Sequence, residues 1–233
     1  MSHRAFTYVA VISSAIAVAS GGVIGFRLIS SSTSSRAASA SSSTASEQVL
    51  DSSGFHGTRD WSDRECRYAT GPFGSQVDAS VAVGVPCGLR YEIAGDPSLA
   101  QRFEATLKFE MVSASSRTRT PICLRLGSER DEVERGWQLA ACHDGRSLFR
   151  VLTWDTAGRR WLPIGERKQK ATPTRSIGIR RKSAQLEFLV DGSPRLTARF
   201  DPGPPAPGPG WARVSVDPGS VARVRRLSVS RVP

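Results

Sequence analysis

Several motifs of catalysis and cofactor binding are missing from this 233-residue sequence. It contains no Gly-x-Ser-x-Gly elbow, which would expose a nucleophilic serine, and no glycine-rich loop that would cradle a phosphate. Histidine is scarce, with 3 residues, and only His143 stands beside an acid, Asp144. Because Gly145 follows this His-Asp pair and indicates a turn, we expect His143 to end a strand rather than to serve as a catalytic base.

Acidic residues are few, with 21 Asp and Glu against 32 Lys and Arg, so the formal net charge is +11. Arginine supplies 28 of these 32 bases. Its guanidinium makes forked contacts with carboxylate, sulfate or phosphate, so acidic polysaccharide, anionic lipid headgroups and nucleic acid are conceivable partners. Nucleic acid is not the favoured one, and the alternative to any ligand is a charged surface that keeps the protein soluble.

Charged residues are absent from residues 5–26. This stretch is long enough for an apolar helix that spans a bilayer, which takes about 20 residues. A cleavable signal peptide is a competing interpretation, since Ala17-Val18-Ala19 is a small-x-small site, and an organelle transit peptide is a third, because residues 1–46 contain no acid. All three interpretations place the rest of the chain outside the cytosol.

The chain therefore divides into three parts. We expect a signal peptide or N-terminal membrane anchor over residues 1–29, a disordered Ser/Ala-rich linker over 30–48, and one folded domain over 49–233. The linker has no apolar periodicity, and as a coil it would reach roughly 20–25 Å.

Alternating apolar residues predict that the folded domain is all-β. Residues 102–112 alternate Phe, Ala, Leu, Phe and Met with polar residues, which gives one buried face. Residues 176–200 predict a three-stranded meander, with turns at Lys182-Ser183 and Asp191-Gly192. We expect this meander at the centre of the domain, a polar wrapping segment over 47–74, and the first strands within 80–93.

The last two predicted strands cover residues 211–216 and 221–232, joined by a turn at Asp217-Pro218-Gly219-Ser220. The apolar phase slips by one residue at Arg225-Arg226, which predicts a β-bulge. Short strands at this spacing favour an antiparallel β-sandwich.

The four cysteines lie at positions 66, 87, 123 and 142. Their spacing does not suit a zinc site, so disulfides in an oxidising compartment are the better interpretation. A hairpin register that sets Cys123 opposite Cys142 also sets Leu124 opposite Ala141 and so matches the apolar faces. This favours Cys123–Cys142 and leaves Cys66–Cys87, while free buried thiols are the alternative.

The order of strands resembles a known family. FEATLKFEM, GWQLAACHDG, LEFLVDGSPRLTARF and the final GWARVSVDPGSVARVRRLSVS are similar to the concanavalin A-like lectin/glucanase jelly roll, in its laminin-G-like and 3-keto-disaccharide-hydrolase-like branch. The resemblance covers about Gly88 to Val232. It implies a jelly-roll sandwich and leaves a loop-bound Ca²⁺ open, although no other feature indicates a cofactor. Because the fold hosts lectins, hydrolases and interaction modules alike, it does not fix an activity.

One group of carboxylates has the spacing of laminarinase-like enzymes of this fold, namely Glu129, Asp131 and Glu134. Catalytic carboxylates must point into one cleft from one strand face. Here the segment is an Arg- and Glu-rich hairpin tip, so we expect a solvated loop that is not catalytic.

Two groups of residues are candidates for ligand binding. Trp137, Trp154 and Trp161 would stack on sugar rings if they are exposed, although tryptophan is more often a core residue. The densest basic run extends from Arg159 to Lys182 and includes Arg180, Arg181 and Lys182. It would bind an anionic polymer, or it forms a solvated face.

The sequence therefore predicts an exported, membrane-tethered jelly-roll domain that binds a carbohydrate or an anionic envelope polymer without catalysis. A glycoside hydrolase and a protein-interaction module are the alternatives. An enzyme should show two carboxylates in one cleft, which a lectin would lack.

Overall fold

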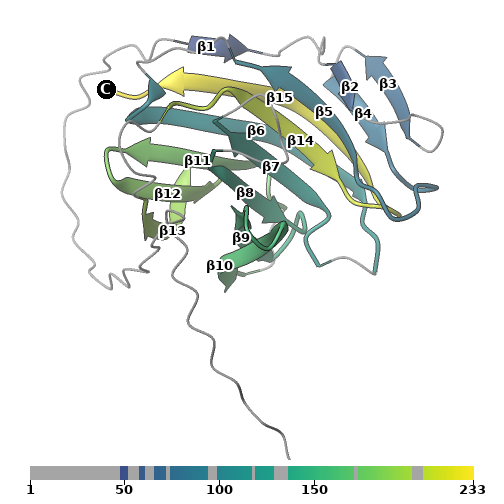
Figure 1. The fold of residues 1–233 in the computed structure, drawn as a ribbon. Helices are drawn as coiled ribbons and strands as arrows, with labels where there is room; N and C mark the ends of the chain where they lie inside the picture. The colour runs from purple at the N-terminus through teal and green to yellow at the C-terminus, as the bar shows by residue number, and fades with distance from the viewer. Residues whose placement is uncertain are drawn as a thin grey trace, which may run out of the picture.

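The computed structural model describes residues 48–51, 58–60, 66–71, 74–93, 99–116, 119–128, 136–170, 173–200 and 207–233. Within these ranges the chain forms two antiparallel sheets that pack face to face (Figure 1), which confirms the predicted β-sandwich. No helix in the described part is long and apolar enough to cross a bilayer. The predicted N-terminal anchor or signal peptide and most of the linker lie outside the described residues.

The eight-stranded sheet has the order β13-β12-β11-β6-β15-β4-β3, with β1 also paired to β15. Its strands are β1 (Gln48–Asp51), β3 (Arg67–Gly71), β4 (Gly74–Asp78), β6 (Arg102–Ser113), β11 (Ser176–Lys182), β12 (Gln185–Val190), β13 (Ser193–Arg199) and β15 (Val221–Arg231).

The seven-stranded sheet has the order β10-β9-β8-β7-β14-β5-β2. Its strands are β2 (Thr58–Asp60), β5 (Cys87–Glu92), β7 (Ile122–Gly127), β8 (Gln138–His143), β9 (Leu148–Asp155), β10 (Arg160–Lys168) and β14 (Trp211–Val216).

The hydrophobic core lies between the sheets and follows from the alternation of each strand. Phe103, Leu107 and Phe109 of β6 are buried, while Lys108 and Glu110 between and beside them are exposed. The register of β15 against β6 shifts between Val224 and Arg226, which confirms the predicted bulge.

The predicted meander forms as β11, β12 and β13, with positive φ at Asp191 and Gly192 in the second turn. Two expectations about it were wrong. The first turn is at Ser183-Ala184 rather than Lys182-Ser183, because Lys182 still pairs with Gln185. The meander also lies at one end of its sheet, since β6 and β15 occupy the middle.

The predicted start of the domain also needs correction. Four strands precede residue 80, so residues 47–74 supply sheet edges and not only a wrapping segment. Residues 79–86 form a loop that exposes Val81, Val83 and Val85. Their alternation looked like a strand, but this loop connects β4 in one sheet to β5 in the other.

The disulfides are those that the hairpin register predicted. Cys123 on β7 lies opposite Cys142 on β8, and the two are bonded, as are Cys66 and Cys87. Both cysteines of the first pair are buried on the outer face of the seven-stranded sheet, beside Ala140. Paired cysteines are typical of proteins from oxidising compartments.

Gly127 provides a test of the packing on this outer face. It lies opposite Trp211 on β14, and an added Cβ would overlap the indole ring, which is fully buried. We expect Gly127→Ala to lower the free energy of unfolding by about 1–3 kcal/mol, as overpacking does. Gly71→Ala is the matched control, because its nearest neighbour would be 4.0 Å away. Equal effects of the two variants in denaturant titrations would contradict this packing.

Candidate functional site

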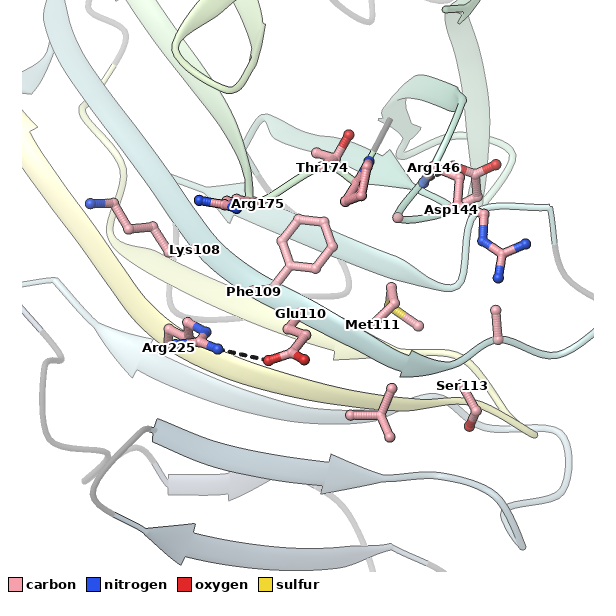
Figure 2. A pocket seen from close by; sticks show the side chains of 14 residues that line it. Lys108, Phe109, Glu110, Met111, Ser113, Asp144, Arg146, Thr174, Arg175 and Arg225 are labelled. Carbon is pink, nitrogen blue, oxygen red and sulfur yellow. Dashed lines mark hydrogen bonds and ion pairs between the residues drawn. The ribbon is translucent and has the colours of Figure 1, made fainter. Parts of the chain in front are cut away.

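A cleft of about 690 Å³ opens where β6 ends on the eight-stranded sheet (Figure 2). Three segments form its walls: residues 108–114 of β6 and beyond, the turn after β8 at residues 144–146, and residues 173–175 before β11. Arg225, at the bulge of β15, completes the lining. These segments are far apart in the sequence, so the cleft depends on the folded sandwich.

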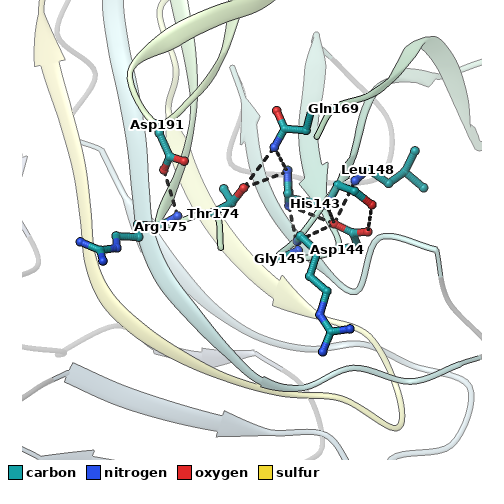
Figure 3. Close-up of polar contacts among 10 residues, drawn as sticks. His143, Asp144, Gly145, Leu148, Gln169, Thr174, Arg175 and Asp191 are labelled. Atoms are coloured by element: carbon teal, nitrogen blue, oxygen red, sulfur yellow. Dashed lines mark hydrogen bonds and ion pairs between the residues drawn. The ribbon is translucent and has the colours of Figure 1, made fainter. Parts of the chain in front are cut away.

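Backbone hydrogen bonds hold the three segments together. The amide of Thr174 donates to the carbonyl of Gly145 over 3.1 Å, and the amide of Phe109 donates to the carbonyl of Arg175 over 2.9 Å. The carboxylate of Asp191, in the β12–β13 turn, accepts from the amides of Arg175 and Ser176 at 2.9 and 2.8 Å (Figure 3). The walls are therefore fixed by main-chain contacts before any ligand arrives.

The carboxylate of Asp144 is occupied by its own turn. Its Oδ1 accepts from the amides of Arg146 and Ser147 at 2.7 Å each and of Leu148 at 3.0 Å. Partial burial acts to raise the pKa of Asp144, but these hydrogen bonds to the charged form outweigh it, and the pKa lies below its ordinary value. Asp144 is thus a charged structural residue of the turn.

His143 lies beneath the cleft as the last residue of β8, as the sequence predicted. Its Nδ1 accepts from the amide of Gly145 over 2.7 Å, and its Nε2 lies 3.3 Å from the hydroxyl of Thr174 (Figure 3). Burial lowers the pKa of His143 most strongly, although Asp144 and Asp191 act to raise it. The imidazole is therefore neutral, and it joins the turn after β8 to the segment before β11.

Glu110 is the other acid among the described lining residues, and it is paired with arginine. Its carboxylate lies 2.8 Å from Arg225 and 3.1 Å from Arg223, both on β15 (Figure 2 shows the Arg225 pair). The hydrogen bond from Arg225 is the largest cause that lowers the pKa of Glu110. Neither acid of the cleft is thus available as a proton donor near neutral pH.

Three cations of the cleft have no such partner. Lys108, Arg146 and Arg175 are exposed and make no ion pair with any residue that the structure describes. Lys108 and Arg175 lie towards one end of the cleft in Figure 2 and Arg146 towards the other, with Phe109 and Met111 between them. Phe109 is 1% exposed, so the apolar surface that the cleft offers to a ligand comes from other lining residues, Met111 and Pro173 among them.

Of the predicted tryptophans, Trp137 belongs to the core. Its side chain is 3% exposed, its ring stacks on Phe103 at 6.2 Å and meets Phe200 edge-on at 5.4 Å. Its Nε1–H donates to the carbonyl of Pro207 over 3.1 Å. Trp137 is therefore a core residue, which was the alternative to sugar stacking, and neither face of its ring is accessible to a sugar.

Trp154 and Trp161 lie opposite each other on β9 and β10, with ring centroids 5.5 Å apart. Both are half-buried, and the guanidinium of Arg125 lies 5.2 Å from the Trp161 ring centroid. They belong to the seven-stranded sheet and do not line the cleft. A role for them in ligand binding stays a prediction.

The strand period separates Arg180, Arg181 and Lys182, so they do not form one exposed patch. Arg180 points outward between Glu104 and Glu187, at 2.7 and 2.9 Å. Arg181 points inward, is 6% exposed, and lies 5.0 Å from the Phe200 ring. Lys182 is exposed and lies 3.7 Å from Glu187. Arg180 and Lys182 thus have carboxylate partners, and Arg181 is buried.

Of the basic run that the sequence singled out, only Arg175 lines the cleft. Lys108, Arg146 and Arg225 were not identified as candidates. The acidic spacing motif of Glu129, Asp131 and Glu134 lies outside the described residues, so its predicted lack of catalytic function stays a prediction. Among described residues, no three His, Cys, Asp or Glu side chains are grouped as a metal site would require. The loop-bound calcium that the resemblance left open stays an expectation.

No protein-family model and no curated protein matches the sequence. Solved structures do match the fold. The CBM2 module of the evolved Dit of Lactobacillus casei BL23 phage J-1 has a TM-score of 0.52 at 10% identity, over 81% of this chain and 97% of that one. The carbohydrate esterase vb_24B_21 of bacteriophage phi24B has a TM-score of 0.50 at 13% identity, over 81% and 100% of the two chains.

The binding domain of botulinum neurotoxin serotype D has a TM-score of 0.51 at 8% identity, over 79% of this chain and 48% of that one. Such identities show a shared fold alone. The fold is an antiparallel β-sandwich of the kind that these solved structures share, and it is compatible with the concanavalin A-like jelly roll that the sequence resembles. Fold and site together define a β-sandwich domain with a cationic cleft.

The buried imidazole beneath the cleft predicts a pH dependence of stability. An unfolded histidine takes up a proton near its ordinary pKa of 6.5, whereas folded His143 has a lowered pKa and resists protonation. The free energy of unfolding should therefore fall as pH falls below 6.5, by up to about 1.4 kcal/mol per pH unit. Urea titrations between pH 7.5 and 5 measure this slope.

His143→Gln is the control, because the other histidines remain in it and their contribution cancels in the comparison. We expect a smaller slope in the variant. Asp144, whose pKa lies below its ordinary 3.8, would lose its contribution only at more acidic pH. An unchanged slope in His143→Gln would contradict a neutral, buried His143.

Proposed function

We propose that this protein is an exported carbohydrate-binding domain that holds a polysaccharide in the cleft without catalysing its cleavage. The observation that carries the proposal is the lining of the cleft. Three unpaired cations surround an apolar floor, while both lining acids are committed to other protein groups.

The dimensions and composition of the cleft support this function. A volume of about 690 Å³ lies within the usual range for small-ligand sites, about 300–1,000 Å³. Met111 and Pro173 offer apolar surface to the face of a sugar ring, and arginine and lysine supply hydrogen-bond donors at the rim. Two proteins of similar fold are named as a CBM2 module and a carbohydrate esterase, which agrees with the proposal.

The same geometry does not favour hydrolysis. Glycosidases need two carboxyl groups, one with a raised pKa that can donate a proton. Glu110 and Asp144 both have lowered pKa values. Burial raises the pKa of Asp217, against a smaller lowering by Arg125, but Asp217 lies in the turn after β14 and does not line the cleft. His143 is fully buried and so cannot reach a substrate as the base of an esterase.

Export is part of the proposal. Two disulfides suit an oxidising compartment, and the uncharged N-terminal stretch suits a signal peptide or membrane anchor. The domain would thus meet its polymer at or beyond a membrane.

Incubation of the protein with neutral and acidic polysaccharides, with retention and new reducing ends read together, tests the function. We expect retention on at least one polymer and no release of reducing ends. Ala114→Trp should weaken retention about tenfold or more, because Ala114 lines the cleft and a large ring would fill it. Ala69→Trp, at an exposed position on the edge strand β3, is the matched control.

Each part of the proposal has its own contrary outcome. Retention that Ala114→Trp and Ala69→Trp change equally would remove the cleft as the site. Reducing ends that accumulate with the wild-type protein would make it a glycoside hydrolase, and Gln variants of Glu129, Asp131 and Glu134 would then identify the acids.

A further inference from the structure

We propose that the cleft selects a polysaccharide with anionic groups, carboxylate or sulfate, on successive sugar residues. This inference rests on the proposed function and deepens it, because carbohydrate binding alone would also fit a neutral polymer. The carboxylates near the cleft interact with other groups of the protein, and the unpaired cations lie towards its two ends.

Two acids near the cleft accept hydrogen bonds from the backbone of its arginines. Asp144 accepts from the main-chain amide of Arg146, and Asp191 accepts from that of Arg175. Each carboxylate thus fixes the position of an arginine without pairing with its guanidinium. The hydrogen bond from the arginine amide to the carboxylate stabilises the loop. The guanidinium of the same arginine is left without a carboxylate partner.

Three arginines of the same sheet do have carboxylate partners. Arg180 lies between two glutamates, and Arg223 and Arg225 share Glu110. The sheet therefore has carboxylates placed to pair with its cations, but none reaches Lys108 or Arg175 among the described residues. Unpaired like charges around one hollow repel each other, and an anionic ligand would relieve that repulsion.

The spacing of the cations favours a polymer over a small anion. Arg175 and Lys108 are neighbours, because the carbonyl of Arg175 accepts from the amide of Phe109. The backbone of Arg146 is also near that of Arg175, since the amide of Thr174 donates to the carbonyl of Gly145, but the side chains of Lys108 and Arg146 lie towards opposite ends of the cleft (Figure 2). An acidic polysaccharide can place one charge at each of these ends and a sugar ring between them.

Two pairs of polymers isolate the charge from the sugar backbone. Polygalacturonate is compared with its carboxyl-reduced form, and dextran sulfate is compared with dextran, using the full-length protein. We expect tight binding of a charged member and binding of its neutral counterpart that is at least about tenfold weaker. Affinity for the charged polymer should fall roughly tenfold between 50 and 200 mM salt, because bound counterions are released. Galacturonate monomer and inorganic sulfate should bind far more weakly than the polymers.

Two triple variants separate the cleft from the overall positive charge. Lys108→Gln, Arg146→Gln and Arg175→Gln together should weaken binding of the charged polymer by roughly 10- to 100-fold. The control carries Arg102→Gln, Arg199→Gln and Arg231→Gln, which remove the same charge from exposed positions at the other end of the same sheet. The control should bind nearly as wild type.

Several outcomes would overturn the inference. Equal binding of the charged and neutral polymers of a pair would show that the protein does not select anionic groups. The proposed carbohydrate binding would then stand, and the preference for anionic polymers would be wrong. Equal loss in the two triple variants would mean attraction by net charge alone. Tight binding of monomer or sulfate would remove the two-ended cleft, and binding only to vesicles that contain an anionic phospholipid would replace the polysaccharide with a membrane surface.

Discussion

The pairing of β6 with β15 is the contact on which the cleft depends. These long strands occupy the middle of the eight-stranded sheet, with β11 on one side and β4 on the other. Their alternation buries Phe109 and exposes Lys108 and Glu110, and the bulge after Val224 places Arg225 beside Glu110. A one-residue change of register would exchange the buried and exposed faces, so the core and the cleft are fixed by the same hydrogen bonds.

Carboxylates near the cleft either pair with arginine side chains or accept hydrogen bonds from backbone amides. Only the first kind neutralises a cation, so the second kind leaves the cleft positively charged. Glu104, Glu187 and Glu110 pair with arginine side chains on the sheet surface. Asp144 and Asp191 accept main-chain amides at turns, as short acidic side chains do well. A shorter side chain reaches the backbone of its own or a neighbouring turn, while the longer glutamate reaches across strands. The positive charge of the cleft is thus a result of local turn chemistry rather than of net charge.

Much of the fold could be predicted from local signals. Alternation located β6, the meander and β14, and the phase slip located the bulge in β15. The register of β7 and β8 followed from matching apolar faces, and it gave the Cys123–Cys142 pair. The position of the meander in its sheet could not be predicted, because it depends on long-range pairing that no local pattern specifies.

The cleft was harder to predict than the fold. Its cations come from β6, from the turn after β8 and from the residues just before β11. A single lysine such as Lys108 in an alternating strand looks like any other exposed residue, so the sequence gives no reason to select it. A dense basic run was a misleading guide, because strand alternation buries Arg181 and cross-strand glutamates pair with Arg180. Sequence spacing predicts which face a residue occupies only after the phase of the strand is known.

The direction of β15 has a consequence for how this domain can be displayed. Gln48 of β1 pairs with Ser230, at the end of β15 that lies beside the start of β6, whereas the cleft lies where β6 ends. Eleven residues of β15, at about 3.3 Å each, separate the two ends by roughly 35 Å. Any attachment through the residues before Gln48 would therefore hold the domain at the end of the sheet opposite to the one where β6 ends beside the cleft.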